Sequence, residues 1–126
     1  MSETTAATST ATVVDGYFAV WNQTDAGRRR ELIASTWTDD ACYVDPLFEA
    51  SGTAALDRMV ATVHERYPDH RFRLTAPVEA HHDRARWGWE FGVPGEPPVV
   101  AGVDFAVLGE DGRLREVTGF FERPAA

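Results

Sequence analysis

VVAGVDFAVLGEDGRLREVTGFF, residues 99–121, predicts two antiparallel strands joined by a tight turn. Residues 99–108 are apolar almost throughout and are strongly strand-like. Residues 110–112, Glu-Asp-Gly, have the composition of a hairpin turn, and residues 114–121 follow as the last strand. The stretch therefore predicts a β-hairpin that carries one acid, Asp104, inside its most apolar strand.

The alternation of apolar and polar residues continues upstream of this hairpin. It runs through residues 72–80 and again through residues 87–91, and the polar segments 81–84 and 93–98 predict turns between the strands. Pro77 interrupts the first of these strands and predicts a bend or a sheet edge there. Together with the hairpin, these segments predict a meander of four long strands.

Before the meander, apolar residues recur at helical spacing in three places. They predict a helix that starts near Ala11, a second over residues 28–37, and a third after Gly52 with Thr53 as its N-cap. Residues 42–44 have the β-branched and aromatic character of a short strand. The order of these elements predicts an α+β fold with three helices packed on a curved antiparallel sheet.

Length and composition predict a single domain. The chain has 126 residues, of which we expect 1–10 to form a flexible tail and 11–126 to form the domain. The N-terminus has neither the basic nor the apolar segment of a signal peptide, and no run of residues is long and apolar enough for a membrane span. The lone Cys42 excludes an internal disulfide and suits the reducing cytoplasm.

The charge of the chain restricts its partners. A net charge of −8 argues against binding to nucleic acid or to an anionic membrane, because both require clustered basic residues. The one basic run, residues 28–30, is followed by an acid and is expected to form a solvated helix face. Cys42 has no histidine or cysteine at a zinc-site spacing, so we expect no metal site.

Three polar residues occupy positions where an apolar residue is the rule. Asp104 either faces a cavity or points outward from a half-exposed strand. Tyr17 lies on the apolar stripe of the first helix, where it is either a core residue or a donor to a ligand. Asp45, followed by Pro46, is either a turn residue at a strand end or a base aimed into an apolar cavity.

Two segments resemble the bacterial Δ5-3-ketosteroid isomerases, and more broadly the NTF2-like (SnoaL-like) superfamily. They are TDDACYVDPLFEASGTAALDRMV, residues 38–60, and the hairpin stretch of residues 99–121. The resemblance extends over residues 11–121 and implies a cone-shaped sheet, wrapped by helices around a deep apolar pocket. Such a fold is also described as a cystatin-like α+β barrel.

The resemblance to the isomerases themselves depends on three positions. The isomerases carry a catalytic Asp in an Asp-Asp-Ala-x-x-x-Asp-Pro motif, which Asp45 matches in this sequence. Their oxyanion-binding Tyr precedes a helix-ending Asn by five residues, as Tyr17 precedes Asn22. Their second donor is a protonated Asp in a Val-Val-Ala-Pro-Ile-Asp strand, which corresponds to Asp104 in VVAGVD.

These matches imply an allylic isomerisation of a ketone without a metal or a cofactor. Asp45 would remove a carbon-bound proton and return it to another carbon, as a base whose strength is increased in an apolar pocket. Tyr17 and protonated Asp104 would donate hydrogen bonds to the enolate oxygen. The resemblance also implies an apolar small-molecule substrate and a homodimer formed through the outer face of the sheet.

The same comparison implies which residues surround the substrate. The two-residue period places Val100 and Gly102 on the face of Asp104, where Gly102 leaves space beside the acid. We expect the following residues to bind the substrate: Tyr43, Met59, Trp87, Trp89, Phe91, Val100, Gly102, Val117, Gly119 and Phe121.

Several of these residues differ from the isomerase pattern. Met59 replaces an aromatic residue, while Trp89 replaces a smaller side chain and, together with Trp87, shortens the expected cavity. Tyr43 adds a hydroxyl close to the proposed base Asp45. The candidate substrates are therefore a steroid, a polyketide intermediate or a smaller enone, of which the last two fit a smaller pocket.

Two other functions remain open for the same fold. SnoaL-like polyketide cyclases use a pocket Asp as acid and base in an intramolecular aldol closure, and other members bind an apolar ligand or a protein without catalysis. Limonene-type epoxide hydrolases require an Arg two residues before the strand Asp, where this chain has Gly102. The isomerase hypothesis requires that Tyr17 and Asp104 meet within hydrogen-bond reach, across the cavity from Asp45.

Overall fold

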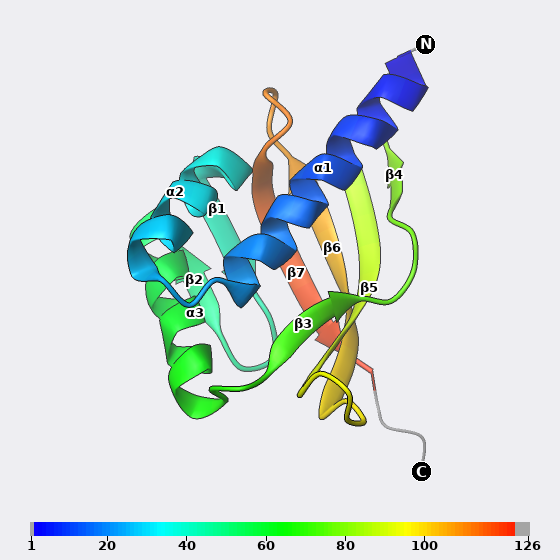
Figure 1. The fold of residues 1–126 in the computed structure, drawn as a ribbon. Helices are drawn as coiled ribbons and strands as arrows, with labels where there is room; N and C mark the ends of the chain where they lie inside the picture. Colours follow the sequence, from blue (N-terminus) through cyan, green and yellow to red (C-terminus); the bar gives the residue numbers. More distant parts are fainter. Residues whose placement is uncertain (1, 123–126) are drawn as a thin grey trace.

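Three helices cover one face of a seven-stranded sheet in the computed structural model of the chain, which describes residues 2–122 (Figure 1). The helices are α1 (Ser2–Asn22), α2 (Ala26–Thr36) and α3 (Thr53–Arg66). In Figure 1, α1 crosses the sheet diagonally, while α2 and α3 lie to one side of it next to β1. The predicted α+β architecture of helices on a curved sheet is confirmed.

The strands follow the predicted alternation of apolar and polar residues. In chain order they are β1 (Trp37–Val44), β2 (Glu49–Ser51), β3 (Arg71–Leu74), β4 (Glu79–His81), β5 (Arg84–Gly92), β6 (Val100–Leu108) and β7 (Leu114–Phe121). The first strand of the predicted meander is divided into β3 and β4 around Pro77, as the proline predicted. The strand order in the sheet is β2-β1-β7-β6-β5-β3, and β4 also pairs with β5.

The sheet is mixed and not antiparallel throughout. The pairs β5–β6 and β6–β7 are antiparallel, whereas β1 pairs with β7 in parallel, with Tyr43 opposite Val117. Sequence patterns indicate strand direction only where a short turn joins two neighbours, and β1 and β7 are separated by most of the chain. This parallel pair brings the end of β1, and therefore Asp45, next to β7.

Two helix boundaries differ from the predictions. Helix α1 begins at Ser2 and not near Ala11, so residues 2–10 continue the helix; this segment contains neither glycine nor proline, the two strongest helix breakers. Helix α3 has Gly52 and not Thr53 at its N-cap position, because the chain turns there with a φ of 86° that favours glycine.

Among the described residues, no helix is both long and apolar enough to cross a membrane.

One arginine of the expected solvated run is buried. Arg29 has an exposed fraction of 4%, and its Nε lies 2.6 Å from Asp57 Oδ1 of α3. The Nη1 of Arg29 donates to the carbonyl oxygen of Gln23 at 2.9 Å. Breaking a buried pair of this kind leaves a charge without compensation and costs about 3–5 kcal/mol. The composition of a basic run does not reveal which of its residues faces inward, so the prediction was wrong for Arg29.

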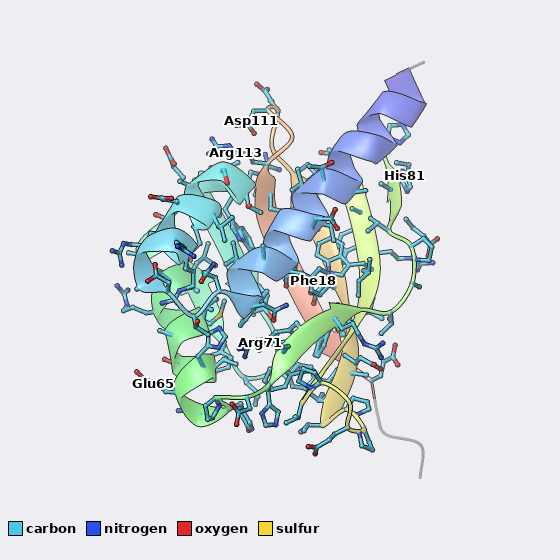
Figure 2. All side chains as sticks on the ribbon, viewed as in Figure 1. Phe18, Glu65, Arg71, His81, Asp111 and Arg113 are labelled. Atoms are coloured by element: carbon cyan, nitrogen blue, oxygen red, sulfur yellow. The ribbon has the colours of Figure 1, made fainter. Side chains whose placement is uncertain are left out.

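The turn between β6 and β7 is connected to the end of α2. Arg113, labelled in Figure 2 next to Asp111, donates hydrogen bonds to the carbonyl oxygens of Ala34 and Trp37, at 2.8 and 2.9 Å. It also pairs with Asp111 in the same turn, at 2.6 Å. These contacts satisfy carbonyl groups where the helix ends and β1 begins. They hold the start of β1 beside the β6–β7 hairpin.

Candidate active site

An apolar cavity of about 200 Å³ lies between α1, the end of α3 and the inner face of the sheet. Most of its wall consists of aromatic and aliphatic side chains, and two carboxyl groups and three tyrosines are set among them. The lining residues are Tyr17, Trp21, Tyr43, Asp45, Leu47, Phe48, Val63, Tyr67, Phe72, Trp89, Phe91, Val99, Val100, Asp104 and Phe121. An apolar cavity with a few convergent polar groups is the usual form of a small-molecule site.

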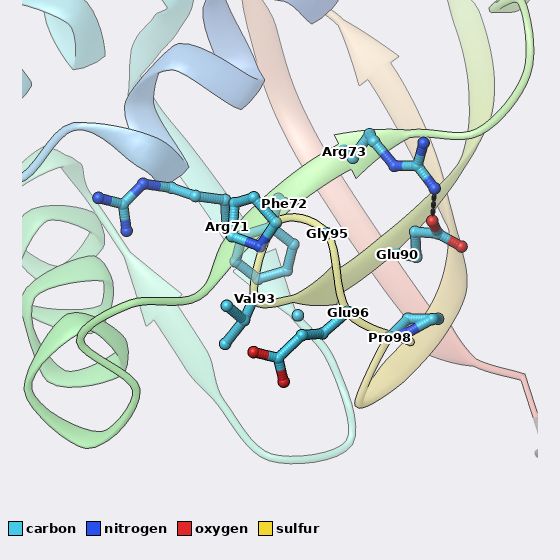
Figure 3. A pocket seen from close by; sticks show the side chains of 10 residues that line it. Arg71, Phe72, Arg73, Glu90, Val93, Gly95, Glu96 and Pro98 are labelled. Atoms are coloured by element: carbon cyan, nitrogen blue, oxygen red, sulfur yellow. Dashed lines mark ion pairs between the residues drawn. The ribbon is translucent and has the colours of Figure 1, made fainter.

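A second hollow is an open groove of about 450 Å³ between β3 and the loop of residues 93–98 (Figure 3). The groove shares Phe72 with the cavity, and in it Arg73 forms an ion pair with Glu90. These two charged groups therefore neutralise each other at the surface. We place the candidate site in the smaller cavity, where the carboxyl groups face apolar walls.

The first polar pair in the cavity consists of Tyr17 on α1 and Asp104 on β6. The Tyr17 hydroxyl donates to Asp104 Oδ2 at 2.7 Å, and both side chains are almost fully buried. The helical stripe places Tyr17 against the sheet, and the pleat of β6 places Asp104 on the inner face. The structure thus brings together two of the three residues that the isomerase resemblance singled out.

A tryptophan also contacts this pair. The indole Nε1 of Trp89 donates to Asp104 Oδ1 at 3.0 Å, so each carboxyl oxygen has one donor. This contact was missed because Trp89 was expected to serve only as a wall of the pocket. Trp89 and Asp104 lie on separate strands, and their separation in the sequence does not predict a hydrogen bond between them.

Burial shifts the acidity of both members of the pair. Loss of solvent raises the pKa of Asp104 to about 7, against the hydrogen bonds from Tyr17 and Trp89, which lower it. Burial, followed by the charge of Asp104, raises the pKa of Tyr17 well above its usual value. Near pH 7, therefore, Tyr17 is neutral and a substantial fraction of Asp104 is protonated.

The second polar pair consists of Asp45 and Tyr43. Asp45 Oδ1 accepts hydrogen bonds from the backbone N–H groups of Leu47 and Phe48, both at 2.8 Å. Asp45 Oδ2 accepts one from the Tyr43 hydroxyl at 2.5 Å. Asp45 is therefore a turn residue and a cavity carboxylate at once, so the two interpretations of this position are compatible. The three donors fix the direction of its side chain.

The two pairs lie on either side of Gly119. A Cβ atom at this position would lie 2.9 Å from Asp104 Oδ1, 3.2 Å from Asp45 Cβ and 3.4 Å from the Tyr43 hydroxyl. Gly119 is the register partner of Asp104 on the neighbouring strand. The missing side chain lets Asp104, Asp45 and Tyr43 approach the backbone of β7 closely, and even a methyl group there would crowd Asp104.

The predicted substrate-binding residues fall into two groups. Tyr43, Trp89, Phe91, Val100 and Phe121 line the cavity, whereas the others lie outside its lining: Met59, Trp87, Gly102, Val117 and Gly119.

The residues outside the lining are packed for identifiable reasons. Trp87 lies behind Tyr17, with ring centroids 5.1 Å apart, and Met59 and Val117 belong to the buried core. The indole of Trp89 covers Gly102. An inward-facing position is thus not sufficient to reach the cavity, because α1 fills part of the inner face.

Several lining residues were not predicted from the sequence. Leu47 and Phe48 come from the turn before β2, where the two-residue period does not assign a face. Val99 was predicted as the first residue of a strand, on the face opposite Asp104, but it precedes β6 and lines the cavity. Trp21 and Phe72 were recognised only as apolar positions of a helix and a strand. Among the described residues, no three His, Cys, Asp or Glu side chains are grouped as metal ligands.

Comparison with known protein families identifies the fold. A model of the SnoaL-like domain matches residues 14–117, which is most of the chain and includes Tyr17, Asp45 and Asp104. The chain belongs to the SnoaL-like family. None of the curated proteins compared with this SnoaL-like chain is similar enough in sequence to count as a relative.

Solved structures agree with this assignment. A proposed isomerase of the SnoaL-like family from Agrobacterium tumefaciens is 31% identical, with a TM-score of 0.86, and the match covers 92% of this chain and 99% of that one. A proposed polyketide cyclase from Sinorhizobium meliloti is 16% identical, with a TM-score of 0.66 and coverages of 85% and 92%.

A further neighbour shows the same fold with a bound small molecule. It is a Catenulispora acidiphila protein with a ketosteroid isomerase-like fold, in complex with trimethylamine, and it is 15% identical with a TM-score of 0.71. The match covers 87% of this SnoaL-like chain and 85% of that one. The NTF2-like, ketosteroid isomerase-like fold predicted from the sequence is confirmed.

Proposed function

We propose that the chain is an enzyme that isomerises a β,γ-unsaturated ketone to its conjugated isomer, in the manner of a ketosteroid isomerase. The observation that carries the proposal is the hydrogen bond of 2.7 Å between Tyr17 and Asp104 in an apolar cavity that also holds Asp45. This arrangement combines a carboxylate base with two neutral donors. The similar fold of a proposed isomerase supports the same class of reaction.

The proposed reaction moves one proton and one double bond. Asp45 removes a proton from the carbon between the carbonyl group and the double bond, and the electron pair of that C–H bond moves through the carbonyl to form a dienolate. When the substrate binds, the single hydroxyl proton of Tyr17 turns from Asp104 Oδ2 to the dienolate oxygen. That oxygen, which carries the developing charge, also accepts a hydrogen bond from protonated Asp104. Asp45 then returns the proton to the far carbon of the former double bond, so atoms and electrons balance without a cofactor.

A polyketide cyclase is the second candidate, favoured by structural neighbours that are themselves proposed polyketide cyclases. In that reaction Asp45 would remove the proton next to a ketone, and the resulting enolate would attack a second carbonyl group of the same molecule. The two reactions differ in their product. Isomerisation creates a conjugated enone from one ketone, whereas cyclisation creates a carbon–carbon bond and a hydroxyl group.

The first prediction separates these functions by their products. We expect the protein to convert a single-ring β,γ-unsaturated ketone to the conjugated enone, followed by the rise in ultraviolet absorbance and by NMR of the product. The control is the heat-denatured protein, which retains the composition of the preparation but not the cavity. A linear polyketone that closes to an aldol product, without isomerisation of any β,γ-enone, would instead assign the cyclase function.

The second prediction concerns the proposed homodimer. Phe105 and Phe120 are exposed by 42% and 60% on the outer face of the sheet, where a partner could bury them. We expect the protein to have the mass of a dimer in light scattering, and Phe120→Asp to shift it toward the monomer. The exposed Glu122→Gln is the control for changes near the end of β7. A monomeric mass for the unaltered protein would contradict the proposal.

A further inference from the structure

We propose that Trp89 is the positioning and specificity-determining residue of this site: its indole N–H orients Asp104, and its ring sets the size of the substrate. The catalytic consequence rests on the proposed isomerase function, whereas the contact with Asp104 does not. The isomerase resemblance implied that Trp89 binds the substrate and, being larger than the usual residue at this position, shortens the cavity. The hydrogen bond gives it a second role.

The first step of the argument is the contact with Asp104. Trp89 is 4% exposed, and its Nε1 is 3.0 Å from Asp104 Oδ1, while Tyr17 occupies Oδ2. With a donor on each oxygen, the carboxyl group has little freedom to rotate. A substrate oxygen therefore approaches Asp104 on the side of Oδ2, where the Tyr17 hydroxyl can also contact the substrate oxygen.

The second step is the way in which Trp89 itself is held. Its ring packs edge-to-face against Phe72 and Phe121, with centroid distances of 5.5 and 5.8 Å. Trp89 lies on β5, and its register partner on the neighbouring strand β6 is Gly102. A Cβ atom on residue 102 would lie 2.5 Å from the indole Cζ2 of Trp89. Any larger residue at 102 would displace the ring, so Gly102 and Trp89 act together.

The third step is the size of the space that remains. The cavity has a volume of about 200 Å³, whereas pockets for drug-sized molecules have roughly 300–1,000 Å³. The ring of Trp89 forms one wall, next to Phe72 and Phe121. The inferred substrate is therefore a ketone with one or two rings, and the four fused rings of a steroid would require Trp89 to move.

The fourth step links Trp89 to the acidity of Asp104. The titratable groups around Asp104 are Tyr17 from α1, and Tyr43 and Asp45 from β1 and the turn after it. Burial and the charge of Asp45 raise the pKa of Asp104, and the hydrogen bonds from Tyr17 and Trp89 lower it. Removal of the indole N–H is therefore expected to keep Asp104 protonated to higher pH.

The first arm of the test measures this titration directly. Carbon-13 NMR follows the carboxyl carbon of Asp104, assigned by its absence in Asp104→Asn. We expect Trp89→Phe to raise the midpoint by about one pH unit, the effect of one lost hydrogen bond. The alkaline limb of the kcat/KM profile is expected to shift by a similar amount.

A second buried tryptophan supplies the matched control. Trp37 also packs against Tyr17, with a centroid distance of 5.9 Å, but its indole nitrogen has no hydrogen-bond partner among the described residues. Trp37→Phe is therefore expected to leave the Asp104 midpoint unchanged. An equal shift in both variants would assign the effect to general loosening of the core and would overturn the positioning role.

The second arm tests substrate size. We expect Trp89→Ala to raise kcat/KM for a four-ring β,γ-unsaturated ketosteroid relative to a one-ring β,γ-enone by at least about tenfold. Trp89→Leu, which retains more packing, is measured in its place if the alanine variant does not fold. An unchanged ratio in the folded variant would overturn the specificity role.

The two proposals fail in different ways. Absence of ketone isomerisation in the unaltered protein, together with a shifted Asp104 midpoint in Trp89→Phe, would reject the isomerase function and retain the positioning of Asp104. An unshifted midpoint in an active Trp89→Phe variant would reject the inference and leave the isomerase function intact.

Discussion

Asp45→Asn is expected to lower kcat for the β,γ-enone by roughly 10²–10⁴-fold, the usual contribution of a positioned general base. The amide cannot accept the substrate proton, because its oxygen is far less basic than a carboxylate. Its oxygen can still accept hydrogen bonds from the backbone of Leu47 and Phe48, and its NH₂ group can face the oxygen of Tyr43. The variant therefore retains the turn after β1 while it loses the base.

Initial rates measure the loss of the base in Asp45→Asn, and a thermal unfolding curve shows whether the turn after β1 is retained. The matched control is Asp39→Asn, which removes a carboxylate from an exposed position of the same strand. We expect the control to keep the full rate and both variants to unfold at nearly the temperature of the unaltered protein. A full rate for Asp45→Asn would remove Asp45 from the mechanism.

The second large effect concerns the pH dependence of turnover. The pKa of Asp104 is raised to about 7 by burial, and only the protonated form can donate a hydrogen bond to the dienolate. We therefore expect kcat/KM to fall about tenfold for each pH unit well above 7, unless another step limits the rate. Asp104→Asn keeps a neutral donor at this position, so its alkaline fall is expected to disappear.

The same shift of Asp104 changes the stability of the fold. The folded protein holds this proton up to about pH 7, whereas the unfolded chain loses it near the usual value of 3.8. Between these values the folded state binds more protons, so the free energy of unfolding decreases as pH rises, by roughly 4 kcal/mol in total. Urea unfolding of the unaltered protein and Asp104→Asn across this interval measures the difference. A parallel decrease in both would contradict the assignment to Asp104.

The helices and strands were largely predictable because the spacing of apolar residues within each segment indicates its type. Apolar residues at helical spacing indicated which face of α1 contains Tyr17, and alternation along β6 identified Asp104 as exceptional. Both observations depend on residues close together in the sequence. The parallel pairing of β1 with β7 and the burial of Arg29 depend on distant segments, and no local pattern specifies them.

The same distinction applies to the candidate site. Local patterns marked both of its acids as unusual but left two interpretations for each, and the family resemblance singled out Asp45 and Asp104 as site residues. The hydrogen bond from Trp89 and the close approach of both acids to Gly119 appear only when strands are placed in register. A glycine or a tryptophan in a strand has many possible roles, and its neighbours across the sheet decide among them.

The parallel contact between β1 and β7 also determines when the site can first exist. Tyr17 and Asp45 are made early in synthesis, but Gly119, which separates Asp45 from Asp104, belongs to the last strand. Closing such a long loop has an entropic cost that must be met before the contacts at its ends can form. Because β7 lies between β1 and β6 in the sheet, the two polar pairs can come together only after this strand has been synthesised and has entered the sheet.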